Sequence, residues 1–331
     1  MKELIHLAYK ESFLMKYRDF GNTGIKVSEI GFGSWPIGGN SHGMSYGPTD
    51  DKDSQDALNK AFELGCNFFD TADVYGWGHS EELLGKTFKS KRDKVIIATK
   101  VGADFYQGTG FQTFTRDYIR FALNKSLTRL KTDYLDVYQL HNPPMKLLGN
   151  PEIYQALEDL KHEGRIRAWG VSVFTPVEGM TAINIGHPDC IQISYNIFSY
   201  RAEDQLFPLA LEQGCAVIAR EPLANGFLTG KYKRAEPFKF AAGDTRKNWP
   251  EDYVKARMDA AAQLNFLEKQ GQSQTQAALR YDLCEKAVST VIVGMKTPAH
   301  AEENLQAADL SLRAEDLLKI KELQASGFNL K

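Results

Sequence analysis

Asn67-Phe68-Phe69-Asp70-Thr71-Ala72-Asp73-Val74-Tyr75-Gly76 is the stretch around which the rest of the chain can be ordered. Its first residues form a short apolar run, which predicts a buried strand. The strand ends in the carboxylate of Asp70, and the turn that follows presents Tyr75 beside a glycine. A buried strand gains nothing from a terminal charge, so we expect Asp70 and Tyr75 to have a chemical role.

Short apolar runs of this kind recur eight times. Amphipathic segments lie between them, and we expect helices over residues 54–64, 80–88, 116–130, 151–162, 176–183, 205–212, 253–269, 275–285 and 298–308. Strands that alternate with helices imply parallel pairing through right-handed crossovers. Eight such units in a little over about 250 residues predict an α/β fold of the (β/α)8 TIM barrel type. The predicted strands cover residues 30–32, 67–69, 95–98, 134–140, 166–171, 190–194, 216–219 and 290–293.

The alternative fold is an open doubly wound sheet, which normally carries a glycine-rich phosphate loop. Gly31 and Gly33 begin such a motif, but Pro36 interrupts it. Around the barrel we expect three additions: an N-terminal β-hairpin over residues 17–30, a long loop after strand 7 over residues 221–250, and a C-terminal helix over residues 313–324. Residues 1–15 are interpreted as an N-terminal extension and residues 16–331 as a single domain.

Composition excludes several classes of partner. The 40 basic and 42 acidic residues nearly cancel, which argues against nucleic acid and charged membrane surfaces. No apolar run reaches the roughly 20 residues that a membrane-spanning helix needs. The four scattered cysteines indicate a reducing, cytoplasmic compartment and fit neither a zinc site nor a disulfide framework. We expect a monomer or a weak homo-oligomer.

Polar residues stand where three consecutive predicted strands end. The second strand delivers Asp70 and Tyr75, the third ends in Lys100 and the fourth in His141. A free tyrosine has a pKa near about 10, and a neighbouring ammonium lowers it. We therefore expect Lys100 to lower the pKa of Tyr75, Asp70 to keep Lys100 charged, and His141 to donate a hydrogen bond to a carbonyl oxygen.

Other catalytic schemes fit less well. The chain has no G-x-S-x-G motif for a serine nucleophile. His141 has no histidine or carboxylate at helical spacing, so we expect no metal. Asp70 and Asp73 could pose as the paired carboxylates of a glycosidase, but that leaves Lys100 unexplained.

Taken together, these motifs resemble the aldo-keto reductase superfamily, from Tyr17 to about Asn304. The resemblance implies a barrel that binds NADPH across its C-terminal mouth, with Tyr75 as general acid and base. It is strongest to bacterial-type aldehyde and sugar reductases and to the β-subunits of potassium channels. The matching motifs are Gly31-Phe32-Gly33, Asp70-Thr71-Ala72-x-x-Tyr75-Gly76, Ser80-Glu81-Glu82-Leu83-Leu84-Gly85, Ala98-Thr99-Lys100, Leu140-His141, Gly170-Val171-Ser172, Gln192-x-x-Tyr195-Asn196, Pro222-Leu223-Ala224-x-Gly226, Gly294-x-Lys296-Thr297 and Glu303-Asn304.

The resemblance also assigns cofactor and substrate residues. Ser172 and Gln192 match residues that hold the nicotinamide carboxamide, and Lys231 and Arg246 match basic residues of the long loop. The substrate residues are Trp35, Tyr75, Trp77 and His141. The cofactor residues are Ser34, Trp35, Asp70, Ser172, Gln192, Arg220, Glu221, Pro222, Leu223, Ala224, Asn225, Lys231, Arg246, Gly294, Lys296, Thr297, His300, Glu303 and Asn304.

The choice of NADP over NAD rests on the residues before one predicted helix. Thr297-Pro298 begins a helix, and helix N-termini attract phosphate. Lys296 precedes this start, and His300 lies one turn further along the helix. The alternative is a capped surface helix beside a lysine with no binding role, but the residues favour a site that binds a 2′-phosphate.

Two positions depart from the family pattern. Val173 stands where many members have Asn or Arg, so one amide contact is expected to be missing. Arg220 stands where an aromatic ring often stacks on the nicotinamide, and its charge should weaken binding of NADP⁺ relative to NADPH.

The sequence therefore predicts an NADPH-dependent reductase of aldehydes or ketones. Two alternatives stay open: a sugar dehydrogenase that works in the oxidative direction, and a cofactor-sensing regulatory protein like the channel β-subunits.

Overall fold

A computed structural model describes residues 14–42, 46–106, 112–232, 240 and 242–329. Of the expected N-terminal extension, residues 1–13 lie outside this described part. Met15 belongs to the same extension by sequence, yet it packs in the main hydrophobic core with 6% of its surface exposed. The packed part of the chain therefore includes Met15.

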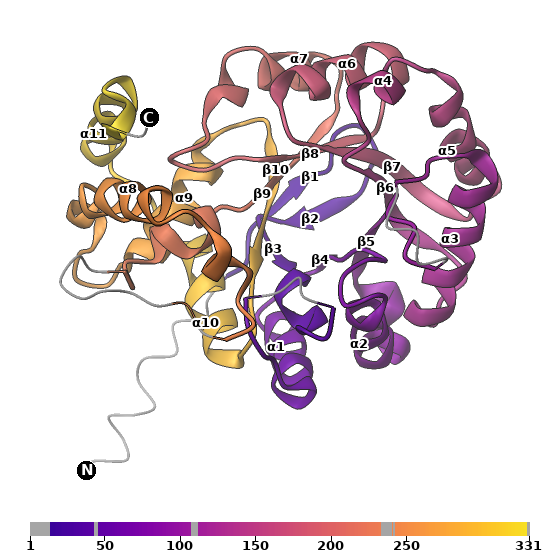
Figure 1. The fold of residues 1–331 in the computed structure, drawn as a ribbon, viewed down its shortest axis with the longest axis horizontal. Coiled ribbons are helices and arrows are strands. Elements are labelled where there is room, and N and C mark those ends of the chain that lie inside the picture. Colours follow the sequence, from indigo (N-terminus) through magenta and orange to yellow (C-terminus); the bar gives the residue numbers. More distant parts are fainter. Residues whose placement is uncertain (1–13, 43–45, 107–111, 233–239, 241, 330–331) are drawn as a thin grey trace.

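Eight parallel strands form a closed barrel, and helices surround it (Figure 1). Their order around the barrel, β10-β3-β4-β5-β6-β7-β8-β9, follows their order along the chain. The (β/α)8 prediction is confirmed, and the open sheet is excluded because the barrel has no edge. The strands are β3 (Ile30–Gly33), β4 (Phe68–Asp70), β5 (Ile96–Val101), β6 (Leu135–His141), β7 (Ile166–Val173), β8 (Cys190–Ser194), β9 (Ala216–Arg220) and β10 (Val288–Gly294).

The helices follow the predicted amphipathic segments closely. Thr175 and Ser273 each form the reciprocal capping box that fixes a helix start. One predicted helix over residues 253–269 ends earlier, because the chain turns after Ala262 and buries Leu264 and Leu267. The helices are α1 (Asp51–Glu63), α2 (His79–Phe88), α3 (Arg116–Leu130), α4 (Met145–Leu148), α5 (Glu152–His162), α6 (Pro176–Gly186), α7 (Leu206–Glu212), α8 (Glu251–Ala262), α9 (Gln274–Cys284), α10 (Pro298–Gln306) and α11 (Ala314–Ala325). No helix in the described residues is long and apolar enough to cross a membrane.

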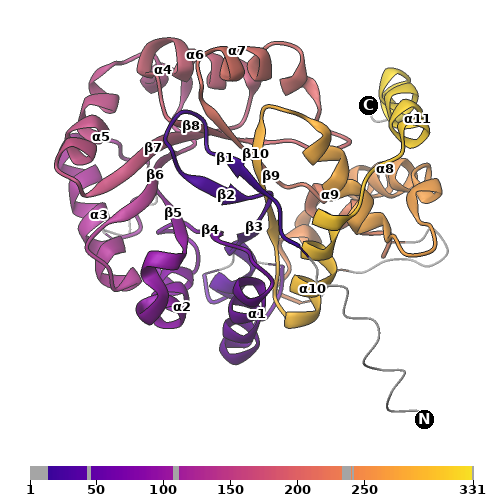
Figure 2. The same cartoon turned by 180° about the vertical axis from the view of Figure 1, so that it is seen from behind.

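A two-stranded antiparallel hairpin, β1 (Tyr17–Asp19) and β2 (Lys26–Ser28), lies across one end of the barrel (Figure 2). Its side chains Phe20, Ile25 and Val27 are buried against the barrel interior. The hairpin therefore plugs this end with apolar groups.

Inward-facing side chains change character along the barrel axis. Alternate residues of a strand face the same side, so a step of two residues moves one layer up the barrel. The layer next to the hairpin is apolar, and the layer above it is polar. The paired steps are Phe68 to Asp70, Ala98 to Lys100, Val137 to Gln139 and Cys190 to Gln192.

The predicted long loop follows β9 and lies beside the connection between β3 and α1. It contains two short 3-10 turns, Ala224–Thr229 and Thr245–Asn248. Tyr46 and Asp244 pair in an isolated antiparallel bridge, which joins the two connections. These two segments together form one wall of the site described next.

Candidate active site

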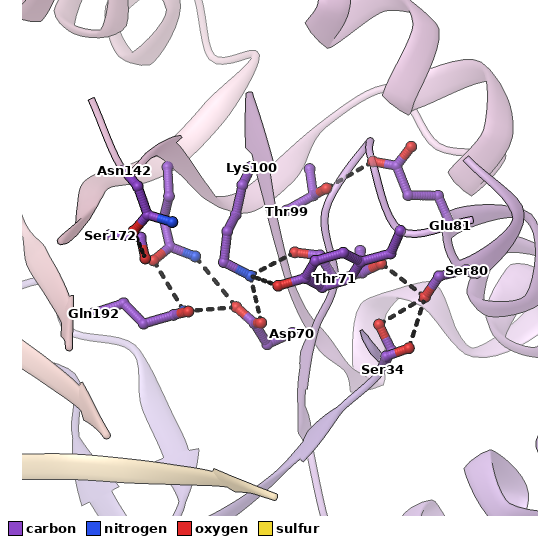
Figure 3. Close-up of polar contacts among 12 residues, drawn as sticks. Ser34, Asp70, Thr71, Ser80, Glu81, Thr99, Lys100, Asn142, Ser172 and Gln192 are labelled. Carbon is purple, nitrogen blue, oxygen red and sulfur yellow. Dashed lines mark hydrogen bonds and ion pairs between the residues drawn. The ribbon is translucent and has the colours of Figure 1, made fainter. Parts of the chain in front are cut away.

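The ammonium of Lys100 stands at the centre of the site, on β5. Its Nζ donates to Asp70 Oδ1 at 2.5 Å and to the carbonyl of Thr71 at 2.8 Å (Figure 3). The same Nζ lies 3.4 Å from the hydroxyl of Tyr75. Lys100 is fully buried and Asp70 is 2% exposed. Burial disfavours the charged lysine, but Asp70 and Tyr75 outweigh this and raise its pKa. Lys100 is therefore a stable cation inside the barrel.

The second carboxylate oxygen of Asp70 is held by two amides. Gln192 Nε2 donates to Asp70 Oδ2 at 2.8 Å and Gln139 Nε2 at 3.3 Å. Gln192 also donates to Gln139 Oε1 at 3.2 Å. The sequence reasoning missed Gln139, although it lies two residues before His141 on β6 and so faces the same way.

The pKa of Tyr75 departs from the sequence-based expectation. Burial raises this pKa, and the opposing effect of Lys100 does not reverse the shift. The expectation of a lowered pKa was wrong because it counted the nearby charge and left out the loss of solvent. The phenol is therefore protonated at neutral pH, and Lys100 is positioned to stabilise its conjugate base.

His141, at the end of β6, faces Tyr75 across the cavity. Their ring centroids are 5.9 Å apart in an edge-to-face arrangement. Burial, with Lys100 and Arg220 nearby, holds the pKa of His141 well below its usual range. The imidazole is therefore neutral at pH 7 and has one N–H to donate.

The loop that carries Tyr75 is held by contacts behind it. Gly76 packs so closely on Gly38 that a Cβ at Gly76 would lie 2.0 Å from the carbonyl oxygen of Gly38. Thr71 Oγ1 donates to Ser80 Oγ at 2.9 Å, and Ser80 Oγ donates to Ser34 Oγ at 2.7 Å (Figure 3). The tyrosine loop is thus fixed to the connection that follows β3.

A cavity of about 570 Å³ opens above this group. It extends from Tyr75 and His141, between the two joined loops, to Lys296 at the start of α10. The structure brings most of the predicted residues to its wall. They are Trp35, Asp70, Tyr75, His141, Ser172, Gln192, Arg220, Glu221, Pro222, Leu223, Asn225, Lys231, Arg246, Gly294, Lys296, His300, Glu303 and Asn304.

Four predicted binding residues do not line this cavity. The hydroxyl of Ser34 is buried and bonded to Ser80, and Ala224 is packed in the core. Thr297 caps α10 by accepting a hydrogen bond from the backbone of His300. Trp77 is 48% exposed and stacks on His42 outside the cavity.

The far end of the cavity is rich in cations that the protein itself engages. Lys296 Nζ donates to the carbonyl of Tyr46 at 2.7 Å, and burial lowers the pKa of this lysine. Arg246 pairs with Asp244 at 2.7 Å and lies over the ring of Tyr46 at 4.3 Å. The sequence reasoning missed Tyr46 and Asp244, because only the folded loops bring them to the cavity.

The two departures from the family pattern lie together. Arg220 donates to the carbonyl of Val173 at 3.2 Å and forms an ion pair with Glu221. The side chain of Val173 is buried and apolar. Glu221 offsets the charge that was expected to weaken NADP⁺ binding, so that expectation loses part of its physical basis.

Comparison with known proteins agrees with this geometry. Residues 29–325 match the model of the aldo/keto reductase family. The chain belongs to the aldo/keto reductase family. It is 34% identical over 310 residues to aldo-keto reductase YhdN of Bacillus subtilis, covering 91% of each chain. It is 32% identical to L-galactose dehydrogenase of Arabidopsis thaliana, covering 88% of each.

Solved structures of the family are similar as well. The holo form of aldo-keto reductase AKR11C1 from Bacillus halodurans superposes with a TM-score of 0.77 at 32% identity, covering 94% of this chain and 96% of that one. Membership of this family makes the protein an oxidoreductase of carbonyl compounds and implies a nicotinamide cofactor.

Proposed function

We propose that the protein reduces aldehydes or ketones with NADPH, and that Tyr75 donates the proton. The observation that carries the proposal is one cavity with two different ends. At one end a phenol lies 3.4 Å from a buried ammonium, beside a neutral imidazole. At the other end Lys231, Lys296 and Arg246 line the wall.

The residues present fit a phosphorylated dinucleotide. The cationic end can accept phosphate groups, because ammonium and guanidinium groups donate charge-assisted hydrogen bonds to them. Lys296 stands directly before α10, whose N-terminus favours negative charge. Ser172 and Gln192 line the opposite end. When bound there, NADPH supplies the hydride.

The side chains of this chain then handle the proton and the charge. As the carbonyl carbon gains the hydride, its oxygen takes up the π electron pair and then the proton of the Tyr75 hydroxyl. Lys100 stabilises the resulting phenolate until it regains a proton from solvent. The N–H of His141 stabilises the developing negative charge by a hydrogen bond to the same oxygen.

The variant Tyr75→Phe tests the assignment because it removes only the hydroxyl. Loss of a general acid typically costs about 10²- to 10⁴-fold in turnover. We expect a fall in this range, with NADPH bound as tightly as in the wild type by fluorescence titration. Turnover close to the wild-type value in a panel of carbonyl substrates would refute the role of Tyr75.

The variant Lys296→Met tests the preference for NADP. We expect its affinity for NADPH to fall at least about tenfold, because a charge-assisted hydrogen bond to phosphate is lost. Its affinity for NADH, which has no 2′-phosphate, should stay the same. Equal losses for both cofactors would argue against a 2′-phosphate clamp at this lysine.

Oxidation of a sugar is the second candidate. It is supported by the similarity to L-galactose dehydrogenase. Oxidation needs the oxidised cofactor, NADP⁺, and the carboxylate of Glu221 offsets the Arg220 charge that would oppose its binding. Initial rates in both directions with the same sugar and its oxidised form separate the two. A regulatory role, the cytoplasmic location and the oligomeric state stay predictions.

A further inference from the structure

Three polar side chains line the cavity wall beside His141: Ser172, Gln192 and Asn142. The amide NH₂ of Gln192 has two hydrogens. It donates one to Asp70 Oδ2 at 2.8 Å and the other to Gln139 Oε1 at 3.2 Å. The carboxylate only accepts hydrogen bonds, so the orientation of the Gln192 amide is fixed. Gln192 therefore offers the cavity an acceptor, Oε1, and no donor.

The hydroxyl of Ser172 is engaged as well. Its hydrogen is donated to Asn142 Oδ1 at 3.0 Å (Figure 3). The next residue, Val173, has an apolar side chain and supplies no amide. Neither Ser172 nor Val173 then presents a side-chain donor to a ligand.

The side chain of Asn142 is the third polar group on this wall, and among the described residues it has a free hydrogen-bond donor. Its oxygen is turned to Ser172, and no residue in the described ranges accepts a hydrogen bond from its Nδ2. Its backbone is held in place: the N–H donates to the carbonyl of Ser172 at 3.0 Å, and the carbonyl accepts from Gln112 Nε2 at 3.1 Å. The φ of Asn142 is 53°, a left-handed conformation that asparagine tolerates better than most residues. The backbone is therefore fixed and the amide NH₂ is available.

We propose that Asn142 binds the carboxamide of the nicotinamide ring, with its Nδ2 donating to the carboxamide oxygen while Gln192 Oε1 accepts from the carboxamide nitrogen. The inference rests on the proposed function, since it needs a nicotinamide in the cavity. A carboxamide offers an acceptor oxygen and an N–H donor, which complement these two free groups. Asn142 thus supplies, from the end of β6, the amide that Val173 lacks at the end of β7.

The test compares two variants that keep the left-handed backbone. Asn142→Gly removes the amide, and Asn142→Asp keeps an acceptor for Ser172 but replaces the donor with a carboxylate oxygen. We expect dissociation constants for NADPH, measured by fluorescence titration, to rise about tenfold in both variants, as for the loss of one hydrogen bond. A dissociation constant within twofold of the wild type in either variant would overturn the inference.

Two controls separate this role from a general effect of the substitution. His187 has a φ of 51° at the exposed end of α6, so His187→Gly makes the same backbone change away from the cavity and should bind NADPH normally. Equal weakening in His187→Gly would overturn the inference.

In the thionicotinamide analogue of NADPH, a sulfur that accepts hydrogen bonds only weakly replaces the carboxamide oxygen. The wild type should bind this analogue less tightly than NADPH. Asn142→Gly, which has no amide to donate, should bind the analogue and NADPH with equal affinity. Equal discrimination by the two proteins would also overturn the inference. A wild type that binds no NADPH at all would instead refute the proposed function.

Discussion

The two ends of the barrel interior differ although the same strands build both. Next to the hairpin, the inward layer is apolar and closed by Phe20, Ile25 and Val27. One step along the same strands, the inward layer carries Asp70 and Lys100 in a bonded network. The comparison shows how a barrel interior can hold an ion pair. The apolar layer next to the hairpin excludes water, and polar groups in the layer above form hydrogen bonds with the two charged side chains.

This arrangement explains why Lys100 keeps its charge. An apolar floor alone would lower the pKa of a buried lysine. The carboxylate of Asp70 and the phenol of Tyr75 reverse that effect, and the pKa of Lys100 is raised. The polar layer is stabilised by ion pairs and hydrogen bonds, and the apolar layer by packing. Substitutions in the polar layer should therefore lower both stability and turnover, and substitutions in the apolar layer should lower stability alone.

The largest effect is expected for Lys100→Met, which breaks the polar layer. The buried carboxyl of Asp70 loses its cation, and breaking a buried pair in this way costs about 3–5 kcal/mol of unfolding free energy. Turnover should fall at least about 100-fold, because the conjugate base of Tyr75 loses its stabilising charge. Urea unfolding and NADPH-dependent turnover measure the two effects.

The matched control is Lys26→Met at the hairpin end. Lys26 pairs with Asp19 at 2.7 Å, but their side chains are 66% and 71% exposed. An exposed pair contributes about 0–1 kcal/mol. Similar losses of stability in the two lysine variants would refute the contrast between the ends.

Phe20→Ala breaks the apolar layer instead. The ring is fully buried, so its removal should cost about 3–5 kcal/mol of unfolding free energy. Turnover per folded molecule should stay at the wild-type value, because the polar layer above is intact. A loss of turnover as large as that of Lys100→Met would show that the layers are not independent.

Gln139→Leu places an apolar side chain in the polar layer. Asp70 Oδ2 would keep its bond from Gln192 and lose the one from Gln139. We expect a loss of about 1–3 kcal/mol, the cost of leaving a buried polar group less well satisfied. Unfolding in urea measures it, and an unchanged or higher stability would mean that Gln139 is dispensable to the network.

The smallest effect is a pH dependence from His141. Its pKa is lowered in the folded protein, so the unfolded chain binds a proton that the folded chain does not. This part of the stability is fully present above the ordinary histidine pKa of about 6.5 and falls as the pH drops below it. His141→Asn should flatten the loss of unfolding free energy between about pH 7 and pH 5, and His187→Asn, at an exposed site, should not.

Much of the fold and of the candidate site could be predicted because both follow the strand period. Each barrel strand appears as an apolar run, and Asp70, Lys100 and His141 each stand at the end of one. Gln139 was within reach of the same reasoning, since it lies two residues from His141 on one strand. The free amide of Asn142 was not, because it emerges only when the bonds of Ser172 and Gln192 are counted in space.

The contacts between the loops and the direction of the Tyr75 pKa shift could not be predicted from the sequence. Tyr46 and Asp244 are 198 positions apart and meet only through an isolated bridge between two irregular segments, for which no residue period exists. The charge beside Tyr75 could be anticipated from Lys100. The extent of its burial depends on every wall of the cavity, and burial decides the direction of the shift.

The contact between Gly38 and Gly76 has a consequence for how this protein can be altered. Two backbones touch there without side chains between them, so the loop of Tyr75 and the turn that carries Trp35 behave as one part. Anyone who redesigns the pocket for a new substrate will have to exchange the two segments as a unit. Evolution faces the same restriction.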